Sequence, residues 1–257
     1  MNHSVSETYN LELRSLTIGY GRNVVARNIS ACLRGGQLTC LIGRNGIGKS
    51  TLLKTVAGLL PPISGEIMVT SVPVTVSPAG GEGDMAHTPE DPTSSHILSN
   101  RDIAIVLTER IDIQGMRVRD IVGLGRSPYT SFFGRLTTED RRIVDDAMTM
   151  VGLPPQDFAD RLLGEVSDGE RQKAMIAKAI AQQTPVILLD EPTAFLDYPS
   201  KRDTMLMLRT LAHEQRKAIL ISTHDLDVAQ RTTDAAWLFS REGLKDISDT
   251  SRLTCML

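Results

Sequence analysis

The feature that most constrains this chain is a glycine-rich turn between an apolar run and a helical pattern. Residues 38–42 are largely apolar and predict a buried strand, and residues 51–57 have the pattern of a helix. Between them lies the pattern G-x-x-x-x-G-K-[ST], which in a strand–turn–helix context predicts a phosphate-binding loop. The loop consists of Gly43, Arg44, Asn45, Gly46, Ile47, Gly48, Lys49, Ser50 and Thr51.

The residue types in this loop suit a nucleotide phosphate. Gly43, Gly46 and Gly48 can adopt positive φ angles, which bring backbone N–H groups close to phosphate oxygens. The helix N-terminus adds unpaired donors and the positive end of its dipole. We expect Lys49 to reach the β- and γ-phosphates of ATP and the Ser50 hydroxyl to ligate Mg²⁺. A plain glycine turn is the weaker alternative, because both flanks fit.

Two acidic residues follow a second buried strand. Residues 186–189 are apolar, and Asp190 and Glu191 come directly after them. Adjacent carboxylates at the exit of a buried strand are costly unless they are paired or used. With a phosphate loop upstream, we expect Asp190 to join the Mg²⁺ shell and Glu191 to orient or deprotonate the attacking water. Two solvated loop acids are the weaker alternative.

Three more candidates stand at strand ends. His224 follows the apolar run at residues 218–222; most lone histidines are structural, but its position favours a contact with the γ-phosphate. Glu109 follows a strand predicted over residues 103–107, where parallel-sheet proteins place ligand-handling residues. Tyr20 could stack on a base, although taken alone a capping or core aromatic is the favoured interpretation.

Outside the candidate site, the N-terminal half mixes strands with one long loop. Residues 11–18, 24–33 and 66–69 predict strands. Residues 70–100 are rich in Pro, Gly, Ser, Thr and acidic residues, which make a poor core, so we expect a long, mobile surface excursion.

The second half is more helical. Residues 118–163 and 171–182 predict helices, with Thr137 or Thr138 as one helix start. We expect Ser200 to cap a helix that runs to about residue 214, and residues 235–239 to close the sheet. A basic run falls in the first of these regions, and such a run is usually a solvated face. Its arginines are Arg117, Arg119, Arg126, Arg135, Arg141 and Arg142.

Composition narrows the function classes. Net charge is −3, which argues against a general nucleic-acid or lipid-surface binder. No apolar run approaches the roughly 20 residues needed to span a bilayer, and the polar N-terminus lacks the layout of a secretion signal. Cys32, Cys40 and Cys255 show no metal-ligand spacing and favour reduced cytosolic thiols. We therefore expect a cytosolic protein that another chain would hold at any membrane.

Four motifs follow one another along the chain. The phosphate loop is followed by Ser-Asp-Gly-Glu at 167–170, Leu-Leu-Asp-Glu-Pro-Thr at 188–193 and Ser-Thr-His-Asp at 222–225. No single motif is specific, but the ordered set is, and it resembles the nucleotide-binding domain of ABC transporters over residues 11–239. The resemblance implies an α/β P-loop fold with a mostly parallel sheet, an N-terminal antiparallel β subdomain and a helical subdomain.

The resemblance also implies one ABC ATPase domain over residues 1–257. Residues 1–110 and 183–257 would form the nucleotide-binding core, with the insertion at 70–100. Residues 111–182 would form the helical and signature subdomain.

Site roles follow from the same resemblance. Tyr20 would stack on adenine, His224 would be the switch histidine, and Asp197 would belong to the D-loop. ATP would be sandwiched in a head-to-tail homodimer, between the phosphate loop of one chain and the signature segment of the other. Donors at a helix N-terminus would then compensate charge on the γ-phosphate. The signature residues are Ser167, Asp168, Gly169 and Glu170.

This sequence departs from the family pattern at two places. Asp168 and Glu170 stand where Gly and Gln are commonest, and we expect function to survive because the backbone donors remain. Thr108 and Glu109 occupy the place of an expected glutamine. Glu109 could reach Mg²⁺ or water as a carboxylate.

Within the family, residues 122–129 and 133–140 are similar to the helical region of importers for iron–siderophore, haem or cobalamin chelates. The resemblance implies an ATP-hydrolysing subunit on the inner face of the cell membrane, bound to permease subunits and indirectly to a substrate-binding protein, without nucleic acid. Two alternatives stay open. One is a soluble ABC-type ATPase that assembles or remodels cytosolic partners. The other is a nucleotide-gated module without turnover, and the residues that argue against it are the intact Lys49, Asp190, Glu191 and His224.

Overall fold

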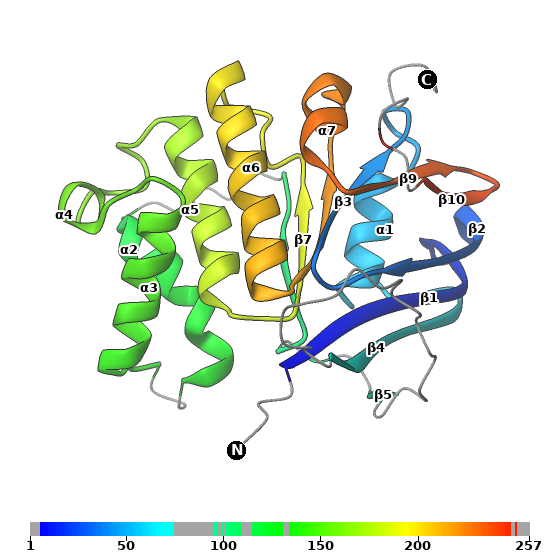
Figure 1. Ribbon diagram of the computed structural model, residues 1–257, viewed down its shortest axis with the longest axis horizontal. Coiled ribbons are helices and arrows are strands. Elements are labelled where there is room, and N and C mark those ends of the chain that lie inside the picture. The colour runs from blue at the N-terminus through cyan, green and yellow to red at the C-terminus, as the bar shows by residue number, and fades with distance from the viewer. Residues whose placement is uncertain are drawn as a thin grey trace, which may run out of the picture.

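Two β-sheets, one six-stranded and one four-stranded, form the framework of the molecule (Figure 1). The computed structural model describes residues 6–74, 95–96, 99, 101–108, 115–130, 134–247 and 250. The larger sheet contains β3 (Gln37–Ile42), β6 (Ile103–Val106), β7 (Val186–Asp190), β8 (Ala218–Ser222), β9 (Ala235–Ser240) and β10 (Gly243–Ile247). The smaller sheet contains β1 (Ser6–Tyr20), β2 (Asn23–Leu33), β4 (Ser64–Val74) and β5 (Ser95–His96).

The larger sheet is parallel except at one edge. Its order is β10-β9-β3-β8-β7-β6, and β10 alone pairs antiparallel within it. The carboxyl ends of β3, β7 and β8 therefore meet at one edge of the sheet, which brings the loops after them together. The prediction that residues 235–239 close the sheet was wrong, because β9 lies beside β3 and β10 forms the edge. Residues 243–247 include the exposed Lys245 and Asp246 and a single buried residue, Ile247, so they carry little strand signal.

The smaller sheet is antiparallel, as expected for the N-terminal part of the chain. Its order is β2-β1-β4-β5. Residues 70–74 continue β4 and residues 95–96 form β5, so the predicted excursion over residues 70–100 is too long at both ends. Most of its remainder lies outside the described residues.

Helices cover both faces of the larger sheet (Figure 1). One face packs against α1 and the smaller sheet, and the other packs against α2, α3, α5 and α6. Among the described residues, no helix combines the length and apolar character needed to cross a membrane. The helices are α1 (Lys49–Val56), α2 (Val118–Gly123), the 3₁₀ helix η1 (Leu124–Tyr129), α3 (Thr138–Met150), α4 (Pro155–Phe158), α5 (Asp168–Ala181), α6 (Tyr198–Gln215) and α7 (Leu226–Thr232).

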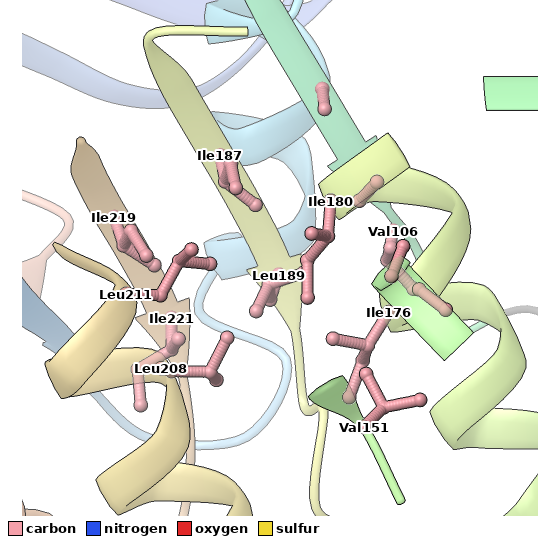
Figure 2. Close-up of a cluster of buried hydrophobic side chains, with 14 of the residues drawn as sticks. Val106, Val151, Ile176, Ile180, Ile187, Leu189, Leu208, Leu211, Ile219 and Ile221 are labelled. Atoms are coloured by element: carbon pink, nitrogen blue, oxygen red, sulfur yellow. The ribbon is translucent and has the colours of Figure 1, made fainter. Parts of the chain in front are cut away.

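Alternation along the central strands explains why the sheet is buried on both faces. Ile187 and Leu189 of β7 point toward the cluster with α5 and α6, as Figure 2 shows. Leu188, between them, belongs to the cluster on the α1 side. Successive strand residues point to opposite faces, so a strand covered on both sides must be apolar throughout. This is why the run at residues 186–189 could be recognised as a buried strand.

Helix caps confirm one predicted start and correct another. Thr137 is the N-cap of α3, and its hydroxyl accepts a hydrogen bond from the Asp140 N–H. The expected cap at Ser200 was wrong, because the N-cap of α6 is Asp197 and its carboxylate accepts from the Ser200 N–H at 2.9 Å. A proline at position 199 suits the first turn of that helix, where its missing N–H has no intrahelical partner to lose.

Arg126 departs from the prediction of a solvated basic face. Its side chain is buried, and Nε donates to Asp140 Oδ1 at 2.8 Å. The same guanidinium donates to the carbonyl oxygen of Ala181 and to Gln183 Oε1, both at 2.9 Å, and lies over the ring of Tyr129. It therefore ties η1 to α3 and to the end of α5.

The cysteines in the described residues are free thiols. Cys40 is fully buried in β3, and burial raises the pKa of its thiol to about 12. Cys32 is partly buried, and its pKa is also raised, chiefly by burial. Both groups are therefore protonated and poorly reactive at neutral pH. Cys255 lies outside the described residues.

Candidate nucleotide site

The phosphate loop joins β3 to α1. Gly46 and Gly48 have φ angles of 73° and 114°, as the sequence predicts. Gly43 does not adopt a positive φ, so that part of the prediction was wrong. Glycine is required there for space instead, because a Cβ atom would lie 2.8 Å from the carbonyl oxygen of Phe239.

The start of α1 has the features of an anion site. Its N-cap is Gly48, which provides no side-chain acceptor, and no acidic residue lies in the first turn. The first N–H groups and the positive end of the helix dipole are therefore available to a phosphate. Lys49 is buried, and its Nζ donates to the carbonyl oxygens of Gly43 at 2.8 Å and Arg44 at 3.3 Å. Its ammonium group thus lies within the loop.

Tyr20 lies beside this loop at the end of β1. Its hydroxyl is 3.4 Å from Thr51 Oγ1, in the first turn of α1. The side chain is 51% exposed, so its ring is not part of the core. This position fits a ring that stacks on a base and argues against the core alternative.

Asp190, Glu191 and His224 gather at the carboxyl ends of β7 and β8. Asp190 ends β7 and is buried, and Glu191 follows with a φ angle of 47°. The Glu191 Oε2 atom lies 3.5 Å from Nδ1 of His224. Because β3 lies next to β8, the phosphate loop opens at the same sheet edge. One strand order thus brings three separate sequence motifs together.

The 167–170 segment begins α5 with a reciprocal capping box. Ser167 is the N-cap, and its hydroxyl accepts from the Glu170 N–H at 3.2 Å. In return, Glu170 Oε2 accepts from the Ser167 N–H and hydroxyl, both at 2.8 Å. Both bonds lower the pKa of Glu170, and the bond from the Ser167 N–H has the larger effect. The acid that departs from the family pattern therefore has a structural partner in its own segment.

The D-loop candidate lies close to that segment. A Cβ atom on Gly169 would lie 3.1 Å from Leu196 Cδ2, so only a residue without a side chain fits this approach without adjustment. Asp197, the next residue, caps α6, and hydrogen bonds from Ser200 lower its pKa. The Asp168 position is exposed at the start of α5.

The expected glutamine position is only partly described. Thr108 follows β6, and its hydroxyl donates to the carbonyl oxygen of Asp190 at 3.0 Å. Glu109 lies outside the described residues. Sequence reasoning missed Ser222, whose buried hydroxyl donates to Asp190 Oδ1 at 2.6 Å. A serine ending an otherwise apolar strand beside His224 was the available signal.

The fold and these contacts define a P-loop nucleotide hydrolase: a phosphate loop lies between the parallel strand β3 and the helix α1, and two acids lie at the carboxyl end of β7 in the same sheet. A family model described as "ABC transporter" matches residues 26–194. The chain belongs to the ABC transporter family and is one of its ATP-binding, ATP-hydrolysing subunits.

Similar proteins lie within the same family. An uncharacterized ABC transporter ATP-binding protein of Methanocaldococcus jannaschii is 39% identical over 228 residues, 87% of this chain and 71% of that protein. An iron(3+)-hydroxamate import ATP-binding protein of Bacillus subtilis is 35% identical over 86% of this chain and 75% of its own length. A solved structure of a proposed metal-chelate type ABC transporter, in an inward-facing conformation, is 25% identical with a TM-score of 0.75, covering 96% of this chain and 86% of that one.

Proposed function

We propose that this chain is the ATPase subunit of an importer for metal chelates of the iron–siderophore, haem or cobalamin type. The observation that carries the proposal is the 35% identity over 86% of the chain with a subunit named for iron(3+)-hydroxamate import. The match spans far more than the nucleotide motifs, which all ABC ATPases share. A soluble assembly ATPase is the alternative that the experiment below must exclude.

The proposed reaction is hydrolysis of ATP at the carboxyl edge of the larger sheet. Lys49 and the N–H groups at the start of α1 would hold the β- and γ-phosphates, and Tyr20 would stack on adenine. Glu191 would take a proton from the attacking water as the water oxygen bonds the γ-phosphorus and ADP leaves. His224, beside Glu191, would contact the γ-phosphate and keep it aligned with the water.

The residues at this edge suit a Mg²⁺ ion bound together with nucleotide. Mg²⁺ usually takes one or two protein ligands and completes its shell with phosphate oxygens and water. Asp190 and the Ser50 hydroxyl supply such a small set, and the described residues hold no cluster of three or more His, Cys, Asp or Glu side chains that could bind a metal alone. Glu109 remains a further candidate ligand. The ion would neutralise charge on the phosphate oxygens.

A second copy of the chain would complete each site. Ser167, Asp168, Gly169 and Glu170 would face the γ-phosphate held by the other protomer, with Asp197 in the neighbouring D-loop. Ser167 and Asp168 are exposed at the start of α5, which supports this arrangement because that helix end is accessible to a second chain. ATP binding would then close the homodimer and hydrolysis would open it.

The helical part would connect this cycle to the membrane. We assign the nucleotide core to residues 1–110 and 183–257, with an insertion at 70–100, and the helical and signature part to residues 111–182. The latter would contact the cytoplasmic helices of permease subunits, which would hold the chain on the inner face of the membrane. A substrate-binding protein would deliver the chelate to the permease.

Gentle solubilisation of membranes that contain the tagged chain tests this function. We expect a multi-span permease to co-purify, and vesicles containing the complex to import a ferric hydroxamate only when ATP is supplied on the side of this chain. The Glu191→Gln chain is the matched control, because it should assemble without driving import. Recovery of soluble partners alone, with ATPase activity intact, would favour the assembly ATPase.

A further inference from the structure

Two side-chain hydroxyls hold the peptide between Asp190 and Glu191 from the strands on either side. Ser222, at the end of β8, donates through Oγ to Asp190 Oδ1 at 2.6 Å and accepts from the Glu191 N–H at 2.9 Å. Thr108, just after β6, donates through Oγ1 to the carbonyl oxygen of Asp190 at 3.0 Å. Since β6 and β8 flank β7, the peptide is bonded at both of its edges.

The hydrogen-bond ladders of the sheet end at this peptide. The β6–β7 pairing ends at Val106 and Leu189, and the β7–β8 pairing ends at Asp190 and Ser222. The Asp190–Glu191 peptide therefore lies where the ladders end. An unsatisfied peptide group that water cannot reach is destabilising, and the two hydroxyls replace the missing ladder bonds.

The residue after this peptide has an uncommon backbone. Glu191 has a φ angle of 47°, a left-handed conformation that is costly for a residue with a side chain. Such a conformation persists where the surrounding structure fixes it. Ser222 is fully buried, so water does not compete for its bonds. The two hydroxyls thus fix the backbone from which the Glu191 side chain extends toward His224.

We propose that Ser222 and Thr108 are positioning residues for ATP hydrolysis, which hold the Glu191 carboxylate in line with the attacking water. The inference rests on the proposed role of Glu191 as the base. It also gives Thr108 a task at the place of the expected glutamine: its side chain holds the backbone before the base. A misplacement of about 1 Å can reduce a rate by about 100-fold, so the loss of one bond has a measurable effect.

Four variants of the full chain test the proposal. Ser222→Ala and Thr108→Val each remove one hydroxyl, and Thr108→Ser restores it without the methyl group. Thr184→Val is the matched control, because the buried Thr184 hydroxyl also donates to a backbone carbonyl, that of Val186, at the opposite end of β7. Phosphate release gives kcat and KM, binding of a fluorescent ATP analogue gives affinity, and hydrogen–deuterium exchange reports on the Glu191 amide.

We expect Ser222→Ala and Thr108→Val to lower kcat about tenfold or more, with nucleotide affinity within about threefold of wild type. Thr108→Ser should recover most of the rate. The Glu191 amide should exchange faster in Ser222→Ala, because it loses its acceptor. Thr184→Val should keep the wild-type kcat and the wild-type exchange at Glu191.

Two results would overturn the inference. One is wild-type kcat in Thr108→Val and Ser222→Ala; the other is an equal loss of kcat in Thr184→Val. Glu191→Gln, assayed in parallel, separates this failure from that of the proposed function. If Glu191→Gln is inactive while the hydroxyl variants are normal, the positioning role alone is wrong; if Glu191→Gln hydrolyses ATP normally, the assignment of the base is wrong.

Discussion

The Nδ1 atom of His224 lies 3.5 Å from Oε2 of Glu191, across the ends of two neighbouring strands. His224 is more exposed than Glu191, with side-chain exposures of 56% and 26%. The carboxylate is therefore the more enclosed partner, and the imidazole stands on the solvent side of it. This arrangement suits a base that acts on water beneath a ring that contacts the γ-phosphate.

Glu191→Gln should abolish turnover and leave ATP binding intact. The amide is nearly isosteric but cannot accept the proton of the attacking water. Loss of a general base lowers rates by about 10²–10⁴-fold. Phosphate release and binding of a fluorescent ATP analogue measure the two effects. Glu214→Gln, an exposed acid near the end of α6, is the control and should behave as wild type; unchanged hydrolysis in Glu191→Gln would remove Glu191 as the base.

Glu170→Gln should strengthen ATP-dependent dimerisation. The Glu170 carboxylate holds the Ser167 N–H and hydroxyl, and its negative charge would face the γ-phosphate of the partner protomer. Removing the charge lowers repulsion between the signature segment and ATP, so we expect about three- to tenfold tighter association. Sedimentation over a range of ATP concentrations measures the difference in association. The two chains compared are Glu191→Gln and the double variant that also carries Glu170→Gln.

Glu170→Gln should also slightly lower the free energy of unfolding of the isolated chain. An acid in the first turn of a helix stabilises it by about 0.3–1 kcal/mol through the dipole. The control is Ser167→Ala, which removes the hydroxyl donor and should weaken both the cap and the dimer. Equal dimerisation of the Glu170→Gln and parent chains would contradict the placement of this segment against the γ-phosphate.

Sequence reasoning succeeded where one local pattern decides the structure. Uninterrupted apolar runs identified β7 and β8 because both faces of the sheet are buried. It failed for β10, which is half exposed and, within the described part of the chain, pairs with β9 at the edge of the sheet. It also failed at Ser200, because two residues near a helix start can each serve as the cap, and only the backbone conformation at Asp197 distinguishes them.

The candidate site shows the same division. Its main residues were recognisable because each motif follows a strand, and parallel strands bring their carboxyl ends together. The bonds of Ser222 and Thr108 to one peptide could not be predicted, since they depend on the order β8-β7-β6 across the sheet. The burial of Arg126 was missed for a related reason: its partners lie 14 and 57 residues away.

Asp140→Asn should destabilise the helical part strongly. It leaves the buried Arg126 guanidinium without its carboxylate, and breaking a buried pair in this way costs about 3–5 kcal/mol. Chemical denaturation at pH 7 measures the loss. The control is Asp146→Asn on the same helix, where an exposed partner of Arg142 should contribute less than about 1 kcal/mol. Equal losses in the two variants would mean that burial adds nothing to the Arg126 pair.

The ion pair between Asp140 and Arg126 should also make the free energy of unfolding depend on pH in the acidic range. Hydrogen bonds from Thr137, and then from Arg126, lower the pKa of Asp140 from 3.8 to about 2. A carboxyl group with a lower pKa in the folded state stabilises the fold above its unfolded pKa. Its contribution, on the order of 2 kcal/mol, should therefore disappear as pH falls from about 4 to 2. Chemical denaturation at several pH values over this range measures the effect. The free energy of unfolding should change less with pH in Asp140→Asn than in wild type.

Lys217→Met should stabilise the chain at pH 7. Burial lowers the pKa of this lysine from 10.5 to about 8, and its Nζ donates to the carbonyl oxygen of Thr184 at 2.7 Å. At pH 7 the amine is charged in both states, so the cost of burying the cation is fully present. Methionine removes that cost but leaves the buried Thr184 carbonyl oxygen without its donor, which offsets about 1–3 kcal/mol, so we expect a small net gain in the free energy of unfolding.

The stability gained by Lys217→Met should shrink as pH rises. In the folded wild-type chain the Lys217 amine releases its proton above about pH 8, whereas in the unfolded chain it does so only near 10.5. Over that window the unfolded state binds more protons, so the wild type gains stability relative to Lys217→Met. Urea denaturation at pH 7, 8.5 and 10 measures the difference, and Lys245→Met, at an exposed position of β10, corrects for general loss of charge. A difference that stays constant across these pH values would show that burial does not disfavour the Lys217 cation.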